Sequence, residues 1–89
     1  MITDSITIIN KLGLHARAAT KLAATCGRYA CTIQCGKDGQ LVDAKSIMSL
    51  MLLAAPQGSR LQFTFDGDDE QQAHSAVTTL IADYFGEGG

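Results

Sequence analysis

Residues 5–17, SITIINKLGLHAR, contain the change from strand to helix on which the fold prediction depends. Residues 5–9 alternate polar and apolar side chains, which is typical of a strand with one buried face. Residues 10–13 break this alternation, and residues 16–28 favour a helix that Gly27 is expected to end. The apolar stripe predicted along this helix consists of Ala19, Leu22, Ala23 and Cys26.

The remaining chain contains five more predicted elements. They are strands at 31–35 and 40–43, a helix at 46–53, a strand at 61–65, and a helix that starts within 67–70 and ends by Gly86. Asp69 and Gln72 have the spacing of a capping box at the start of the last helix. The inward stripe predicted for that helix consists of Ala73, Ala76, Val77, Leu80, Ile81 and Tyr84.

The order β-α-β-β-α-β-α predicts an α+β fold of two layers, because strands and helices with one apolar face each must pack against each other. We expect an open-faced two-layer β-sandwich with a four-stranded, mostly antiparallel sheet, covered on one face by three helices. Polar strand residues such as Thr7, Gln34 and Gln62 should face water on the other side. The length predicts a single domain, residues 1–89.

The composition excludes several classes of protein. A net charge of −2 argues against nucleic acid or an anionic membrane as the main partner. The longest apolar run, residues 50–55, is too short to span a bilayer, and no secretory signal is predicted. The odd number of cysteines favours a cytoplasmic protein with reduced thiols. Cys26, Cys31 and Cys35 lack zinc-site spacing and are expected to pack in the core; no metal or cofactor is predicted.

His15 is the candidate for chemistry, because it lies at or next to a predicted helix start. Free backbone N–H groups and the helix dipole make such a position an anion site, and the same field favours a neutral imidazole. A neutral imidazole can attack phosphorus, and its phosphorylated product would lie over the N–H groups of Ala16, Arg17 and Ala18. The Arg17 guanidinium could bind the phosphoryl oxygens. The alternative is that His15 is a polar cap and Arg17 a solvated residue.

Three stretches resemble the HPr family of histidine-containing phosphocarrier proteins, which includes the nitrogen-branch relative NPr. They are the active-site segment at 10–19, the start of the second helix at 44–48, and the start of the last helix at 67–70. The resemblance implies that His15 accepts a phosphoryl group on Nδ1 from phosphorylated enzyme I and passes it to a histidine on an enzyme IIA domain, in the sugar or nitrogen branch. It also implies that Arg17 supports the phosphorylated state. A monomer suits such a shuttle.

Ala18 departs from the better-known pattern of this family, which has proline there. Alanine restores an N–H donor in the first turn and removes the fixed φ of proline, so we expect less rigidity with phosphoryl acceptance retained. Two other functions stay open at this point. One is a regulatory protein-binding module that uses the same surface, and the other is an unrelated ferredoxin-like domain that binds a small ligand or RNA.

The helix at 46–53 is apolar nearly all round, and a small domain can bury only one of its faces. Leu50, Leu53 and Ala54 share one face. The other face is predicted as a partner-docking patch, unless the loop over Pro56 covers it. The residues of this docking patch are Ile47, Met48, Met51 and Leu52.

Ser46 is the natural N-cap of this helix, and it matches a position that a regulatory kinase phosphorylates in some members of the family. A serine kinase is therefore a possible further partner. Near the last helix, His74 is expected at the surface. The acidic cluster is explained by helix-terminus electrostatics better than by metal binding. Its members are Asp66, Asp68, Asp69 and Glu70.

Overall fold

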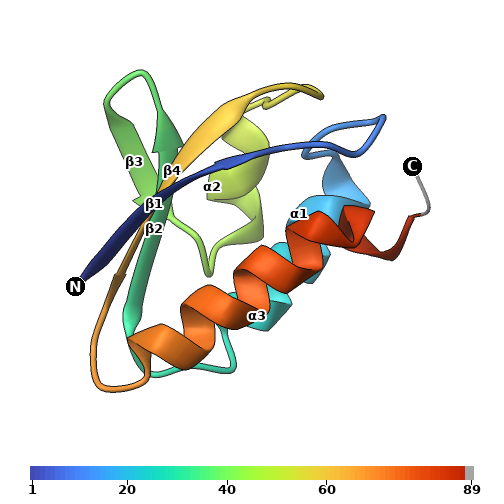
Figure 1. The fold of residues 1–89 in the computed structure, drawn as a ribbon. Coiled ribbons are helices and arrows are strands. Elements are labelled where there is room, and N and C mark those ends of the chain that lie inside the picture. The colour runs from blue at the N-terminus through green and yellow to red at the C-terminus, as the bar shows by residue number, and fades with distance from the viewer. Residues whose placement is uncertain (88–89) are drawn as a thin grey trace.

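Strands and helices follow one another in the predicted order β-α-β-β-α-β-α in the computed structural model, which describes residues 1–87 (Figure 1). The strands are β1 Ile2–Thr7, β2 Thr32–Lys37, β3 Gln40–Asp43 and β4 Arg60–Asp66. The helices are α1 Ala16–Cys26, α2 Ile47–Leu52 and α3 Glu70–Ala82, followed by the short 3₁₀ turn η1 Tyr84–Gly86.

The four strands form one sheet in the order β1-β4-β2-β3, and each neighbouring pair is antiparallel. Phe65 of β4 lies opposite Ile2 on one side and Ile33 on the other, so apolar residues form a row across the sheet. The predicted α+β open-faced sandwich is therefore confirmed.

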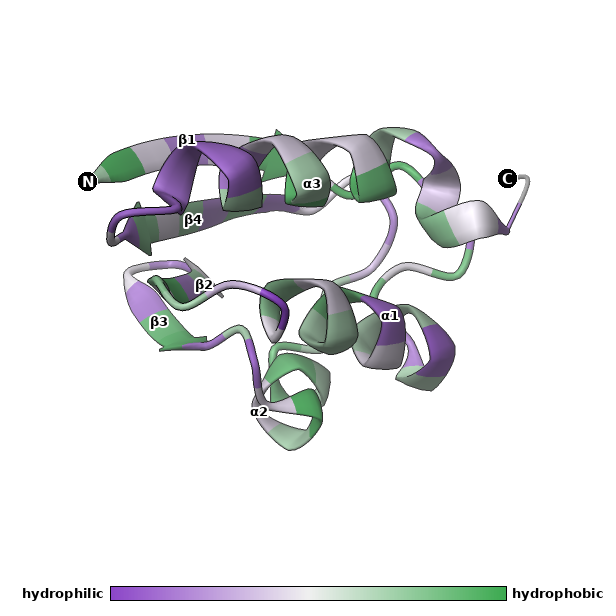
Figure 2. Ribbon diagram, turned by 90° about the horizontal axis from the view of Figure 1, so that it is seen from below, coloured by the Kyte–Doolittle hydropathy of each residue, from purple (hydrophilic) through white to green (hydrophobic). Residues whose placement is uncertain are grey.

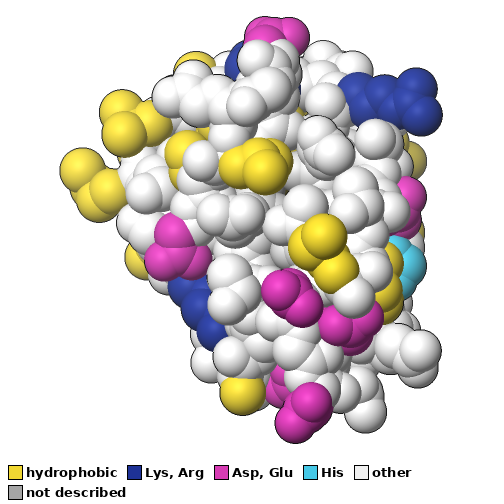
Figure 3. Space-filling view, turned by 90° about the vertical axis from the view of Figure 1, so that its left-hand side faces the viewer, with side chains coloured by type: hydrophobic (Ala, Val, Ile, Leu, Met, Phe, Trp, Pro, Cys, Tyr) yellow, Lys and Arg dark blue, Asp and Glu magenta, His cyan; other side chains and the backbone are white. Residues whose placement is uncertain are grey.

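The helices pack against one face of the sheet, and α1 and α3 lie side by side (Figure 1). Leu22 of α1 and Phe63 of β4 are fully buried between the layers. Thr7, Gln34 and Gln62 are exposed, as predicted for the other face. On the face seen in Figure 3, the basic side chains stand apart from one another, and several acidic side chains lie close together. Within residues 1–87, every helix is too short or too polar to cross a bilayer.

The first strand begins earlier than its alternation predicts, at Ile2 instead of residue 5, and ends at Thr7 instead of residue 9. The register explains the shift, because residues 2–7 pair one by one with residues 60–65 of β4. Ile8 leaves the ladder and donates its N–H to the carbonyl of Ser59, at 2.8 Å.

The predicted capping box at the start of α3 is wrong, because Asp69 makes no side-chain hydrogen bond to its own helix. Its carboxylate instead accepts the N–H groups of Ala30 and Cys31, at 2.8 and 3.0 Å. These bonds hold the pKa of Asp69 below its usual value, with the Ala30 bond as the largest cause. Asp69 therefore ties the start of α3 to the segment that leads into β2.

The end of α3 also differs from the prediction. The helix stops at Ala82, and Tyr84 is exposed although it was assigned to the inward stripe. Phe85 is fully buried in its place, because the chain leaves the helical path at η1 and turns the next side chain inward.

Cys26, Cys31 and Cys35 are free and buried, as the packing interpretation predicts. Burial raises the pKa of Cys26 and of Cys35 to about 12. Both thiols therefore stay protonated near neutral pH, where they behave as small apolar side chains.

His74 is partly exposed, with 31% of its side chain accessible, and it also makes contacts that the sequence did not predict. Its Nε2 lies 2.8 Å from a carboxylate oxygen of Asp4, and its ring meets Phe65 edge-on at 5.3 Å between centroids. The hydrogen bond from His74 is the largest cause that lowers the pKa of Asp4. His74 therefore joins α3 to β1 at the surface of the protein.

Candidate functional site

His15 is the N-cap residue of α1, with extended backbone angles of φ −77° and ψ −179°. Its side chain makes no capping hydrogen bond, and the first helical bond runs from the N–H of Ala19 to the His15 carbonyl, at 2.8 Å. Within residues 1–87, the N–H groups of Ala16, Arg17 and Ala18 consequently have no hydrogen-bond partner. The start of α1 is therefore open to an anion.

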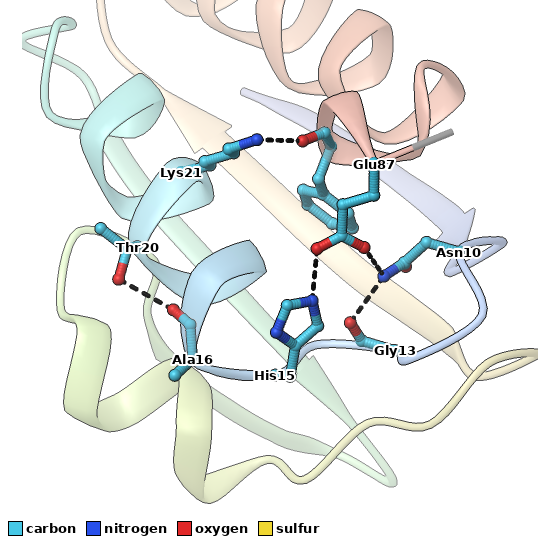
Figure 4. A network of polar contacts seen from close by, with 8 residues as sticks. Asn10, Gly13, His15, Ala16, Thr20, Lys21 and Glu87 are labelled. Carbon is cyan, nitrogen blue, oxygen red and sulfur yellow. Dashed lines mark hydrogen bonds and ion pairs between the residues drawn. The ribbon is translucent and has the colours of Figure 1, made fainter. Parts of the chain in front are cut away.

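The His15 ring is held by one of its two nitrogens. Nε2 makes a hydrogen bond with Oε2 of Glu87, and 27% of the side chain is exposed. Nδ1 has no hydrogen bond within the described part of the chain, and it lies on the side of the ring nearer the start of α1 (Figure 4). The ring thus presents Nδ1 as its accessible nitrogen.

Glu87 is itself fixed by Asn10, a fully buried residue in the loop between β1 and α1. The Asn10 amide donates to Oε1 of Glu87 at 2.9 Å and to the carbonyl of Gly13 at 2.8 Å. Burial raises the pKa of Glu87, but hydrogen bonds from Asn10 and His15, together with the charges of His15 and Lys21, lower it below its usual value overall. Glu87 is therefore ionised at neutral pH.

Two electrostatic influences act on the His15 ring in opposite directions. The start of α1 disfavours a positive imidazolium, because the positive end of the helix dipole lies there. The Glu87 carboxylate favours positive charge on the same ring. The expectation of a neutral ring thus included only one of the two groups that control its charge.

A hollow of about 810 Å³ opens beside the ring. Its lining consists of Lys11, Leu12, His15, Ala16, Arg17, Lys21, Gly86 and Glu87. Arg17 is exposed, and within residues 1–87 its guanidinium makes no hydrogen bond or ion pair. Lys21 instead donates to the carbonyl of Phe85 at 2.7 Å. The hollow therefore combines free N–H groups with an available guanidinium, which suits a phosphoryl group.

The start of α2 is built differently. Ser46 is its N-cap, and the serine hydroxyl oxygen accepts the N–H of Ser49 at 3.2 Å. Its side chain thus satisfies one donor of the first turn, as the sequence predicts.

The four residues of the predicted docking patch are exposed, and α2 is hydrophobic over most of its surface (Figure 2). Their exposed fractions are 40% for Ile47, 73% for Met48, 43% for Met51 and 81% for Leu52. Leu50 and Leu53 are buried, whereas Ala54, which was grouped with them, is exposed. The loop over Pro56 does not cover the patch, because all four of its side chains are exposed.

Two residues of this site were missed by sequence reasoning. Glu87 is 72 residues from His15 and lies among glycines, so no local pattern indicated it. Lys21 had a usable signal, because it follows Arg17 by four residues and thus lies on the same side of a helix.

Comparison with known proteins places these features in context. Residues 2–83 match the family described as "PTS HPr component phosphorylation site". The chain is 50% identical to the phosphocarrier protein HPr of Cupriavidus necator, covering 99% of both chains, and 49% identical to that of Pseudomonas aeruginosa, covering 93% of both.

Solved structures give the same result. HPr-C-His from Thermoanaerobacter tengcongensis superposes with a TM-score of 0.94 at 41% identity, covering 98% of both chains. The swapped dimer of Crh, named as a catabolite repression protein of Bacillus subtilis, has a TM-score of 0.70 at 34% identity, covering 100% of this chain and 98% of its own.

These matches extend over nearly the whole chain and define its class as a phosphocarrier of the phosphotransferase system. The chain belongs to the HPr family.

Proposed function

We propose that this chain accepts a phosphoryl group on Nδ1 of His15 from phosphorylated enzyme I and passes it to a histidine of an enzyme IIA domain. Residues 1–89 would act as one phosphocarrier domain in the cytoplasm. The observation that carries the proposal is the position of His15, whose Nδ1 has no hydrogen bond within residues 1–87 and lies beside the start of α1. Membership of the family supports the choice of partners.

The chemistry requires a nucleophile and a cradle for the transferred group. Nδ1 supplies the lone pair, and the N–H groups of Ala16, Arg17 and Ala18 supply donors for the phosphoryl oxygens. The Arg17 guanidinium adds a charge-assisted contact. One guanidinium and neutral donors would hold the group weakly enough for onward transfer.

The experiment is incubation of the chain with enzyme I and isotopically labelled phosphoenolpyruvate. An acid-labile, base-stable label should appear on the chain and vanish in His15→Ala. His74→Ala is the matched control, because His74 is the second of the two histidines and should keep the label. Label that persists in His15→Ala would contradict the proposal. Chase with purified sugar-type and nitrogen-type IIA domains identifies the acceptor branch.

The docking patch is proposed as the surface that partners contact, because four large apolar side chains are exposed on one short helix. Met48→Asp should slow phosphoryl transfer while the unfolding temperature stays near that of the wild type. Gln62→Asp adds the same charge on the exposed side of the sheet and should leave transfer unchanged. Loss of folding in Met48→Asp would instead assign Met48 a role in packing.

A regulatory protein-binding role is the second candidate, favoured by the likeness to Crh, which is named for catabolite repression. A chain that takes no label from enzyme I would support this role. Regulatory phosphorylation of Ser46 is a separate proposal, since the capping bond to Ser49 already accounts for a serine at this position. Phosphopeptide mapping of the chain from growing cells tests it.

A further inference from the structure

The turn after α3 has an unusual backbone. Tyr84 and Phe85 have φ angles of 57° and 52°, in the left-handed region that disfavours residues with a side chain. Such conformations persist only where their surroundings fix them, and they gather at functional sites. Two contacts fix this turn, because the Phe85 ring is fully buried and its carbonyl accepts from Lys21.

This turn brings Glu87 to the site. The N–H of Glu87 donates to the carbonyl of Tyr84 at 2.9 Å, and the N–H of Gly86 donates to that of Asp83 at 2.8 Å. The Glu87 carboxylate then lies between Asn10 and the His15 ring (Figure 4). Glu87 is therefore held by its own backbone as well as by its neighbours.

The orientation of the Asn10 side-chain amide is set by its contacts with Gly13 and Glu87. Its amide nitrogen donates to two acceptors, Gly13 and Glu87, so the opposite orientation would set an oxygen against both of them. Within residues 1–87, the buried Oδ1 of Asn10 has no hydrogen-bond partner. A buried unpaired acceptor is unfavourable for folding. The arrangement therefore indicates that directing the Glu87 carboxylate has value beyond packing.

We infer that Glu87, held by Asn10, is a positioning residue for phosphoryl transfer through His15. Its carboxylate accepts the Nε2 proton of the ring, which leaves the lone pair on Nδ1, and it stabilises the positive charge that the ring gains on reaction. This inference rests on the proposed function, because it assigns Glu87 to the same transfer.

The step balances without a further reactant. The Nδ1 lone pair forms a bond to phosphorus while the bond from phosphorus to the donor histidine nitrogen breaks, and the leaving nitrogen keeps that electron pair. The proton stays on Nε2, so the His15 ring becomes positive as it receives the PO₃ group. Glu87 faces this positive ring at Nε2, across the ring from the new bond.

The experiment compares Glu87→Ala, Glu87→Gln and the wild type in their rate of phosphoryl acceptance from enzyme I. Loss of a charge-assisted hydrogen bond should slow Glu87→Ala by about 10- to 100-fold, and Glu87→Gln, whose single carbonyl oxygen can accept from Asn10 or from His15 but not from both, should also be slower than the wild type. Asp83→Asn is the matched control, since it removes one negative charge from the same turn without contacting His15. Its rate should equal that of the wild type.

A second readout does not depend on phosphorylation. In proton–nitrogen NMR spectra at alkaline pH, the wild type should show a protected proton on Nε2 of His15, which Glu87→Ala should lose. The inference is overturned if Glu87→Ala accepts phosphoryl as fast as Asp83→Asn, or if the wild-type ring carries its proton on Nδ1. A wild type that takes no label on His15 would overturn the proposed function instead, and the NMR spectra would still test the positioning of the ring.

Discussion

The first turns of α1 and α2 differ in whether a side chain caps their backbone N–H groups. Ser46 caps α2 with its own side chain, whereas His15 makes no capping bond to α1 and instead directs Nε2 toward Glu87. Capping stabilises a helix, so an uncapped start is unfavourable for folding unless something else binds there. The uncapped start of α1 is what the proposed phosphoryl site requires, whereas the cap of α2 stabilises its helix.

Replacing His15 by serine should turn the open start of α1 into a capped one. His15→Ser supplies a capping hydroxyl, so the free energy of unfolding should stay the same or rise by up to about 1 kcal/mol. Phosphoryl acceptance should vanish, because no imidazole remains. Urea unfolding and the labelling assay measure the two effects. A large loss of stability would mean that the His15 ring supports the fold, which would remove the contrast with α2.

Arg17→Ala tests whether the Arg17 guanidinium binds the phosphoryl group at the start of α1. The loss of one charge-assisted contact should slow phosphoryl acceptance by about 10- to 100-fold. Stability should change by less than about 0.5 kcal/mol, because Arg17 is exposed. Initial rates with enzyme I and urea unfolding are the measurements. Arg28→Ala, an exposed residue just beyond the other end of α1, is the control and should react at the wild-type rate.

In contrast to Arg17→Ala, Ser46→Ala should lower stability without slowing phosphoryl acceptance. Removal of the cap lowers the free energy of unfolding by about 1 kcal/mol and leaves phosphoryl acceptance unchanged. Ser49→Ala is the matched control, because it keeps the backbone N–H that Ser46 accepts. Equal stability of the two variants in urea would show that the capping bond contributes nothing.

The start of α3 adds a third case with the smallest expected effect. The folded-state pKa of Asp69 is lowered, so the unfolded chain binds its proton at higher pH than the folded chain does. The stabilisation is thus fully present above the usual carboxyl range and is lost as pH falls through the folded pKa. Urea unfolding from neutral to acidic pH should show this loss, and Asp69→Asn should weaken it. An identical pH dependence in both proteins would contradict it.

The features predicted correctly from the sequence are those that depend on residues close together in the chain. The alternation of Leu61, Phe63 and Phe65 marked β4, and the position of His15 followed from the helix that starts beside it. A capping serine was recognised at α2 because its acceptor role involves a residue only three positions away.

Three contacts that the sequence did not predict join residues distant in sequence. Asp69 was assigned to its own helix but binds N–H groups 38 and 39 residues earlier, and the contact of His74 with Asp4 was not predicted. Glu87 was missed for the same reason. Periodicity identifies which face of an element is buried, but not which side chain of a remote element meets it.

The buried cysteines have a practical consequence. Cys26 and Cys35 are protonated near neutral pH and shielded from solvent, and Cys31 is buried as well. A maleimide dye would therefore react first with a cysteine introduced at an exposed site such as Gln62, without prior removal of the native thiols. Fluorescence at that single site could then follow encounters of the carrier with its partners in real time.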